Sequence, residues 1–154
     1  MLNKYLNYFI LFALLFAIDQ YVKFLFVDGY RLYTDCISLV LAYNKGVAFS
    51  MFEFLSIYLK YIQIAMLSAG LIYLFFNKNI FKQYILAITL LFAGAISNIY
   101  DRFIHEGVVD YVYWHCGFNF AIFNFADVLI DLAIVIILVI QYKEYKKEKS
   151  ANSI

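Results

Sequence analysis

The chain has 154 residues, of which 66% are hydrophobic and only 15% are charged, with a mean hydropathy of +0.79. A soluble domain of this length could not bury so much apolar surface, so the composition predicts an integral membrane protein with a single domain, residues 1–154. The formal net charge is +1 and no basic stripe stands out, so we expect no nucleic-acid partner.

Four apolar stretches are each near the length of about 20 residues that crosses about 30 Å of hydrocarbon as a helix. They cover residues 5–27, 58–76, 81–100 and 125–142 approximately. The first stretch has no small-residue cleavage site and stays apolar past Asp19 and Lys23, so we expect it to be retained as a span and not removed as a signal peptide. Residues 77–80 read as a tight turn between the second and third spans.

The lysines predict the orientation of these spans. Seven of the twelve basic residues fall on the side that carries both termini: Lys4, Lys78, Lys82, Lys143, Lys146, Lys147 and Lys149. The positive-inside rule places that side in the cytoplasm, with residues 143–154 as a cytoplasmic tail. Residues 28–57 and 101–124 then lie together on the extracytoplasmic side.

Each of these two outer segments contains a run of β-branched and aromatic residues. The runs, 36–43 and 108–114, read better as short strands than as helix. Tyr111, Tyr113 and Trp114 have the amphipathic rings that are typical of the headgroup level. The expected fold is therefore mainly α, with four transmembrane helices and a small β-sheet that caps their extracytoplasmic ends.

Several polar residues interrupt the spans. Asp19 and Lys23 lie four apart on one face of the first span, which favours a structural ion pair over direct contact with substrate. Asn98 and Arg102 are spaced alike at the outer end of the third span, where Arg102 could simply complement the helix dipole. Asp101 has the wrong sign for that dipole, so we expect a structural ion pair with a partner that the sequence does not identify.

Asp110 and Asp127 are the strongest candidates for chemistry. Each lies where a span meets water, and carboxylates at the edge of hydrocarbon indicate function by default. Asn124 and Asp127 also fit a helix start, but Asp110 begins no helix and has apolar and aromatic neighbours. Two carboxylates that share one proton can activate water against an amide bond. Asp131, one helical turn after Asp127, is interpreted as a secondary polar group.

Other chemistries have weaker signals. His105 and His115 lack the spacing of zinc ligands, and we expect neither a metal nor a cofactor. A serine–lysine dyad drawn from Ser50, Ser97 and Lys23 is conceivable, but serines are common. Cys36 and Cys116 both fall on the outer side, as a disulfide or as two free thiols.

Two alternatives outside enzymology stay open. A proton or ion conduit would hold its carboxylates near the midplane on facing helices. A non-enzymatic assembly or anchoring protein would tolerate substitution of Asp110 and Asp127. Flux measurements would identify the first, and mutagenesis of the aspartates would identify the second.

Five motifs, in order along nearly the whole chain, resemble bacterial lipoprotein signal peptidase (signal peptidase II). They are Asp19-Gln20-x-x-Lys23; Asn44-Lys-Gly46-Val-Ala48-Phe49-Ser50; Gly94 with Asn98-x-x-Asp101-Arg102; Val109-Asp110; and Phe123-Asn124-x-Ala126-Asp127-x-x-Ile130. Ser97 departs from the family pattern, which commonly has glycine there, and this bears on close backbone packing. Lys45 falls at a variable position and receives no role.

The resemblance implies a membrane-embedded aspartic endopeptidase of the bacterial inner membrane, with its active site near the outer leaflet. Its substrates would be diacylglyceryl-modified prolipoproteins, cut just before the lipidated cysteine to release the signal peptide. Asp110 and Asp127 would be catalytic. Residues that support the pair or bind substrate would be Asn44, Gly46, Asn98, Arg102 and Asn124, with Asp19 and Lys23. Membrane lipid would be a further partner, and we expect a monomer.

Overall fold

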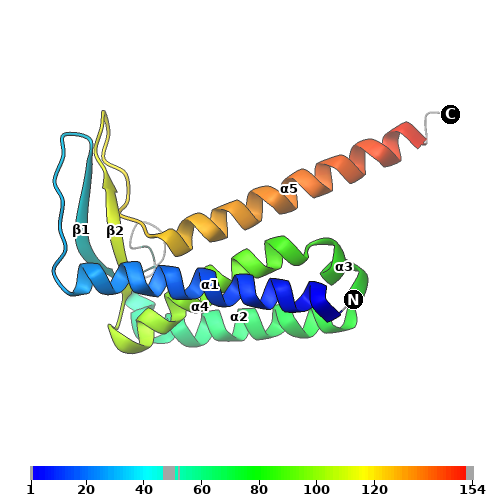
Figure 1. The fold of residues 1–154 in the computed structure, drawn as a ribbon, viewed down its shortest axis with the longest axis horizontal. Coiled ribbons are helices and arrows are strands. Elements are labelled where there is room, and N and C mark those ends of the chain that lie inside the picture. Colours follow the sequence, from blue (N-terminus) through cyan, green and yellow to red (C-terminus); the bar gives the residue numbers. More distant parts are fainter. Residues whose placement is uncertain (1, 47–50, 52, 152–154) are drawn as a thin grey trace.

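The protein is a bundle of long helices with a small sheet at one end (Figure 1). The computed structural model describes residues 2–46, 51 and 53–151. Four of its helices are long and apolar enough to cross a membrane: α1 (Leu2–Val27), α2 (Ser56–Phe76) with the short 3-10 helix η2 (Glu53–Leu55) before it, α4 (Ile85–Ile104) and α5 (Phe125–Ala151). The short helix α3 (Lys78–Gln83) joins α2 to α4. The prediction of four membrane-spanning helices is confirmed.

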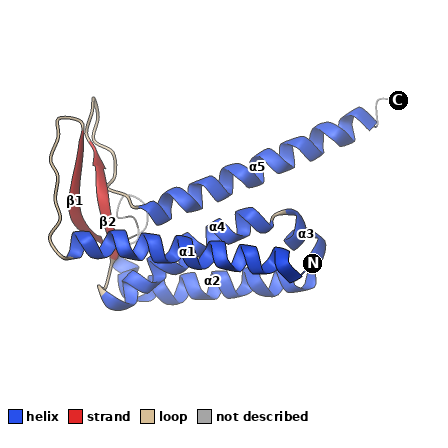
Figure 2. Ribbon diagram, viewed as in Figure 1, coloured by secondary structure: helices blue, strands red, loops and turns tan. Residues whose placement is uncertain are grey.

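The sheet consists of β1 (Ile37–Asn44) and β2 (Val108–Trp114), paired antiparallel. Ile37 lies opposite Trp114 and Asn44 opposite Val108, with an irregularity between Leu39 and Ala42. The two strands stand across one end of the bundle, whereas α3 and the N-terminus lie at the other end (Figure 2). This arrangement confirms the predicted small β-sheet cap and places its two strands within one residue of the predicted runs.

Two helix boundaries differ from the sequence-based expectation. The segment read as a tight turn at 77–80 contains a break only at Asn77, whose backbone N–H and side-chain amide both donate to the Tyr73 carbonyl, at 3.0 Å and 2.8 Å. Helix α3 then covers Lys78–Gln83, so α4 begins at Ile85 and not at residue 81. Helix α5 begins at Phe125 and continues past the predicted span, which ends at about residue 142, into the predicted tail as far as Ala151, because this tail is rich in lysine and glutamate, which are strong helix formers.

Helix α4 is the centre of the bundle. About 61% of an 18-residue apolar stretch of α4 is buried inside the protein, against 17% for the corresponding stretches of α1 and α5 and 6% for that of α2. Small residues allow α4 and α5 to approach closely, and the shared core contains Ala87, Leu90, Ala93, Leu129 and Ala133. A Cβ at Gly94 would overlap the Ala126 carbonyl oxygen and lie 2.9 Å from Ile130 Cγ1. The start of α5 is therefore fixed against the middle of α4.

A disulfide joins Cys36, just before β1, to Cys116, just after β2. The sequence left this pairing open against two free thiols. Next to the disulfide, His115 Nε2 lies 2.9 Å from Ser38 Oγ. The disulfide therefore connects the two strands at the end of the sheet that is farthest from Asn44.

Candidate active site

Asp127 occupies the first turn of α5, where a reciprocal pair of hydrogen bonds holds it. The Asp127 N–H donates to Asn124 Oδ1 at 2.9 Å, and the Asn124 N–H donates to Asp127 Oδ2 at 3.1 Å. This is a capping box, and it confirms the prediction that these residues begin a helix. The carboxyl group of Asp127 is consequently fixed at the positive end of the helix dipole.

Neighbouring elements satisfy the other free N–H groups at this helix start. The Phe125 N–H donates to the Tyr111 hydroxyl at 3.0 Å, and the Ala126 N–H donates to Asp19 Oδ1 at 2.8 Å. Helix termini leave such donors without partners inside the helix, so each needs an outside acceptor. Strand β2 and helix α1 thereby position the turn that carries Asp127.

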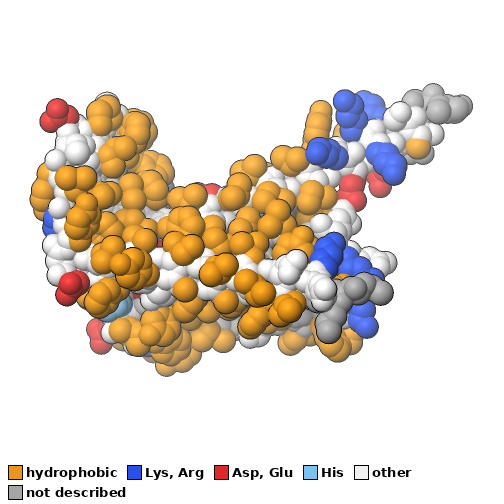
Figure 3. All heavy atoms as spheres, viewed as in Figure 1, with side chains coloured by type: hydrophobic (Ala, Val, Ile, Leu, Met, Phe, Trp, Pro, Cys, Tyr) orange, Lys and Arg blue, Asp and Glu red, His pale blue; other side chains and the backbone are white. Residues whose placement is uncertain are grey.

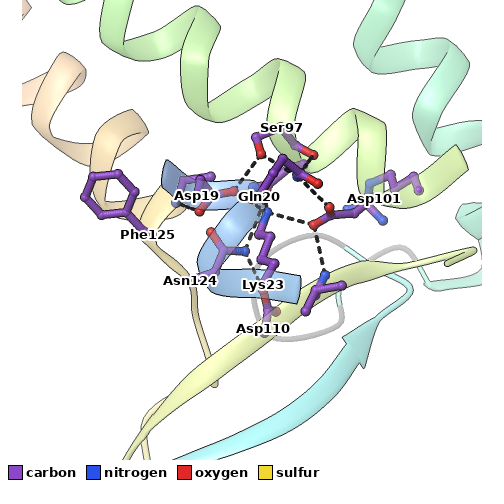
Figure 4. Close-up of polar contacts among 12 residues, drawn as sticks. Asp19, Gln20, Lys23, Ser97, Asp101, Asp110, Asn124 and Phe125 are labelled. Carbon is purple, nitrogen blue, oxygen red and sulfur yellow. Dashed lines mark hydrogen bonds and ion pairs between the residues drawn. The ribbon is translucent and has the colours of Figure 1, made fainter. Parts of the chain in front are cut away.

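A buried network of charges between α1 and α4 lies next to this turn (Figure 4). Lys23 Nζ is 2.7 Å from Asp19 Oδ2 and 2.7 Å from Asp101 Oδ2, and each of these side chains is at most 2% exposed. The predicted Asp19–Lys23 pair is confirmed, and Lys23 is the partner that the sequence could not supply for Asp101. Lys23 also donates to Asn98 Oδ1 at 2.8 Å. All three ammonium donors of Lys23 are therefore used within this network.

Ser97 belongs to the same network and has no access to substrate. Its hydroxyl donates to Asp19 Oδ2 at 2.6 Å and accepts from Gln20 Nε2 at 2.7 Å, and the residue is fully buried. Ser50 lies outside the described residues. The described part of the chain therefore offers no support for a serine–lysine dyad, and Ser97 serves as a hydrogen-bonding group in the network.

Asp110 lies on β2 and is connected to Asp127 through asparagines. Asn124 Nδ2 donates to Asp110 Oδ1 at 2.7 Å, so Asn124 hydrogen-bonds to both aspartates. Asn98 Nδ2 donates to Asp127 Oδ1 at 2.8 Å. Asn44 Nδ2, from the end of β1, donates to Asp110 Oδ2 at 3.1 Å. Three asparagines from three elements thus orient the two carboxyl groups.

Burial raises the pKa of the Asp110 carboxyl to about 7, because the ionised form loses its hydration. The value of about 7 also includes an increase from the charge of Asp127 and decreases from the hydrogen bonds of Asn44 and Asn124 and from the charge of Lys23. Asp110 is only 2% exposed. Near neutral pH this carboxyl is therefore present in both protonated and ionised forms, as a group that transfers protons requires.

Arg102 holds the end of β1 against the site. Its Nη2 donates to the Gly46 carbonyl at 2.5 Å and its Nη1 to the Asn44 carbonyl at 3.3 Å. Its Nε donates to Gln63 Oε1 at 3.1 Å. Arg102 is thus more than the simple helix cap considered from the sequence, because it orders the segment that presents Asn44. The motif residues Ala48 and Phe49 lie outside the described residues.

Both aspartates face one pocket of about 370 Å³. Asn44, Asn98 and Arg102 line its polar part, and Gln63 and Asp131 also reach it. The remaining wall is mainly apolar and is formed by Val108, Phe120, Ala121, Ile122, Phe123 and Ile130. A pocket with a pair of carboxyl groups at a polar end and aromatic side chains beside it suits an apolar peptide near a bilayer.

Some of the predicted site residues line the pocket, whereas others lie behind it. Five of them line the pocket: Asn44, Asn98, Arg102, Asp110 and Asp127. Asn124 is buried behind the two aspartates, whereas Asp19 and Lys23 lie in the network below, and Gly46 accepts from Arg102. Across residues 2–46, 51 and 53–151, no three His, Cys, Asp or Glu side chains are grouped as metal ligands.

Two residues of the site, Gln63 and Tyr111, were not predicted from the sequence. Gln63 is a polar residue within the apolar second span, and that signal could have identified it. Tyr111 was assigned only to the headgroup level, but its hydroxyl accepts from the first N–H of α5. No local pattern indicates that contact, because it joins β2 to a helix that follows a long connection.

Comparisons with known proteins agree with these motifs. The family described as signal peptidase (SPase) II matches residues 11–143. A protein named lipoprotein signal peptidase from Sulfurimonas denitrificans is 58% identical, covering 84% of this chain and 83% of that protein. Its namesake from Wolinella succinogenes is 56% identical, covering 83% and 88%. One from Helicobacter pylori strain Shi470 is 44% identical, covering 96% and 94%.

Two solved structures share the fold. Both are described as bacterial membrane enzymes determined by the in meso method, one at 2.3 Å and one at 1.9 Å resolution. The first superposes with a TM-score of 0.77 at 23% identity, covering 92% of this chain and 90% of that one. The second gives 0.70 at 24% identity, covering 86% and 90%. At these identities the likeness concerns the fold. Since the family match spans most of the chain and the relatives are 44–58% identical over most of their length, the chain belongs to the signal peptidase II family.

Proposed function

We propose that this protein removes signal peptides from diacylglyceryl-modified prolipoproteins by cleaving before the lipidated cysteine, with Asp110 and Asp127 as the catalytic pair. Family membership supplies the reaction class, an endopeptidase that acts on prolipoproteins. One observation carries the assignment of residues: Asn124 hydrogen-bonds to both carboxyl groups, which come from a strand and a helix and face one pocket.

The proposed mechanism is general acid–base catalysis without a covalent enzyme intermediate. Asp127 takes a proton from a water molecule as the water oxygen attacks the scissile carbonyl carbon. Asp110, whose pKa of about 7 suits a proton donor, protonates the carbonyl oxygen to give a gem-diol. The proton on Asp127 then passes to the leaving nitrogen, the C–N bond breaks, and Asp110 recovers its proton from a hydroxyl group of the diol.

The surrounding residues support this pair. Asn98 and Asn124 orient the two carboxyl groups through hydrogen bonds. Arg102 orders the end of β1 so that Asn44 contacts Asp110. Gly46 contributes the carbonyl that accepts a hydrogen bond from Arg102. The apolar wall at Phe120 to Phe123 binds the hydrophobic part of the substrate. Asp19 and Lys23 act indirectly, because they anchor the first turn of α5.

We assign the protein to the bacterial inner membrane, with both termini in the cytoplasm, the site near the outer leaflet, and membrane lipid around the helices. The lysine distribution supports this orientation. We further propose that the protein acts as a monomer. The carboxyl groups of Asp19, Asp101, Asp110 and Asp127 gather toward the sheet end of the bundle and not at its middle, which disfavours an ion conduit.

A gel-shift assay on a lipidated precursor tests the catalytic pair. Asp110→Asn and Asp127→Asn should each lower the cleavage rate by at least about 10²-fold, the scale of a lost acid or base. Asp28→Asn removes an exposed carboxylate just after α1 and serves as the matched control, which should cleave at the parent rate. Substantial cleavage by either pocket variant, with normal accumulation in the membrane, would refute the assignment.

A further inference from the structure

A second recess lies at the end of the bundle opposite the sheet. It is a groove of about 360 Å³ between α1, α2 and α3. Leu71 and Leu74 of α2 form its apolar wall, and the ring of Tyr5 stacks on Phe81 across it with centroids 6.1 Å apart. This volume lies at the lower end of the roughly 300–1,000 Å³ that is typical of small-molecule sites. The catalytic mechanism makes no use of the groove.

Two cations border this apolar groove. Lys78 and Lys82 lie four apart on α3 and therefore share one face of that helix. Among the described residues, neither lysine forms an ion pair. Glu144 is the acidic side chain that meets this end of α3, and it accepts hydrogen bonds from Gln83 and Tyr84. Within the described residues, no carboxylate therefore lies within salt-bridge distance of either lysine.

The fold places these two lysines close to the apolar wall of the groove. Breaks at Asn77 and Tyr84 separate the six residues of α3 from α2 and α4, so that α3 forms the rim where the helices end. Figure 3 shows basic side chains gathered at this end of the molecule, next to a broad hydrophobic surface. An apolar groove with a cationic rim matches the two parts of an anionic lipid.

We propose that this groove is a binding site for an anionic phospholipid, with the lipid phosphate between Lys78 and Lys82 and an acyl chain along Leu71 and Leu74. Basic pockets between transmembrane helices on the cytoplasmic side are suited to anionic headgroups. A zwitterionic lipid would bring its own cation toward the two lysines and would bind less well. A soluble phosphate would leave the apolar wall unused. The site is independent of the proposed catalytic pair, which lies at the other end of the bundle.

Native mass spectrometry of the full chain in detergent, titrated with phosphatidylglycerol or phosphatidylcholine, tests this site. The parent should retain phosphatidylglycerol in preference to phosphatidylcholine. The double variant Lys78→Gln/Lys82→Gln should lower phosphatidylglycerol retention at least fivefold, on the order of 1 kcal/mol. The matched control, Lys146→Gln/Lys147→Gln, removes the same charge from the exposed tail of α5 and should retain the lipid as the parent does.

Two further measurements distinguish lipid binding in the groove from binding of a phosphate alone. Leu74→Trp fills the groove without changing its charge and should also lower retention, whereas millimolar inorganic phosphate should not displace the lipid. Equal losses in the tail control, equal retention of both lipids, or displacement by phosphate would each overturn the proposal. Precursor cleavage in detergent by the Lys78→Gln/Lys82→Gln variant should stay within twofold of the parent, which separates this test from that of the catalytic pair.

Discussion

The carboxyl group of Asp110 is almost completely removed from water, yet two amides donate hydrogen bonds to it. Burial and the charge of Asp127 favour its protonated form and raise its pKa, whereas the two amides favour its ionised form. The resulting pKa of about 7 lets one residue hold a proton at rest and release it during a reaction. The polarity of the neighbours, and not the aspartate alone, sets this chemistry.

Asn44→Ala should change the pH dependence of cleavage through that balance. The substitution removes a hydrogen bond that lowers the pKa of Asp110, so the pKa rises above about 7 and the acid form persists to higher pH. The alkaline limb of kcat/KM should therefore move upward by up to about one pH unit, the equivalent of one hydrogen bond. The measurement is the cleavage of lipidated precursor across pH 5–9. Asn77→Ala, at the far end of the bundle, is the control, and a limb that stays in place or moves downward contradicts the proposed role of Asp110.

Lys23→Met should destabilise the fold strongly. The substitution shortens the side chain by one atom and leaves Asp19 and Asp101 buried without their shared cation. Breaking a buried ion pair in this way costs about 3–5 kcal/mol. Thermal unfolding in detergent measures the effect, with Lys45→Met, an exposed lysine, as the matched control. Equal melting temperatures for the two variants would show that the network adds little stability.

At the scale of elements, local signals predicted local contacts. The Asn124–Asp127 spacing predicted a helix start, and the four-residue spacing of Asp19 and Lys23 predicted an ion pair, because both depend on helix geometry alone. The contact of Tyr111 with α5 and that of Lys23 with Asp101 join separate elements. No pattern along the chain specifies which helix faces reach one another, so these contacts required the structure.

The packing of α4 on α5 depends on Gly94. Gly94→Ala should place a methyl group into the Ala126 carbonyl oxygen and against Ile130, which forces the two helices apart. Overpacking of this kind costs about 1–3 kcal/mol. The same displacement should slow cleavage, because Ala126 lies next to Asp127 in the first turn of α5.

Gly70→Ala is the matched control for Gly94→Ala. Nothing lies within 4 Å of a Cβ at that position of α2, so the added methyl group should only strengthen the helix, by about 0.5–1 kcal/mol. The melting temperature should therefore rise or stay at the parent value, and the cleavage rate should stay at the parent value. A Gly94→Ala variant that melts and cleaves as the parent does would show that the α4–α5 contact tolerates extra volume.

At the scale of the whole molecule, the site forms where the sheet meets the ends of the helices. β1 supplies Asn44, β2 supplies Asp110, α4 supplies Asn98, and α5 supplies Asp127. Hydropathy and lysine placement predicted four spans with outer segments, and the resemblance of the motifs grouped these residues into one site. Neither signal contains distances, and so the bridging position of Asn124 between the two carboxyl groups became evident only in three dimensions.

The disulfide between Cys36 and Cys116 provides a test of the orientation in the membrane. Disulfides persist in oxidising compartments, so a sheet on the extracytoplasmic side should keep both cysteines oxidised in cells. In spheroplasts, a membrane-impermeant maleimide should label the parent chain only after reduction. Asn79→Cys places a thiol on α3, at the opposite end of the bundle, and in a background without the native cysteines it should stay unlabelled until the membrane is permeabilised. Labelling of Asn79→Cys in intact spheroplasts, together with protection of the reduced Cys36 and Cys116, would reverse the proposed orientation and place the catalytic pocket on the cytoplasmic side.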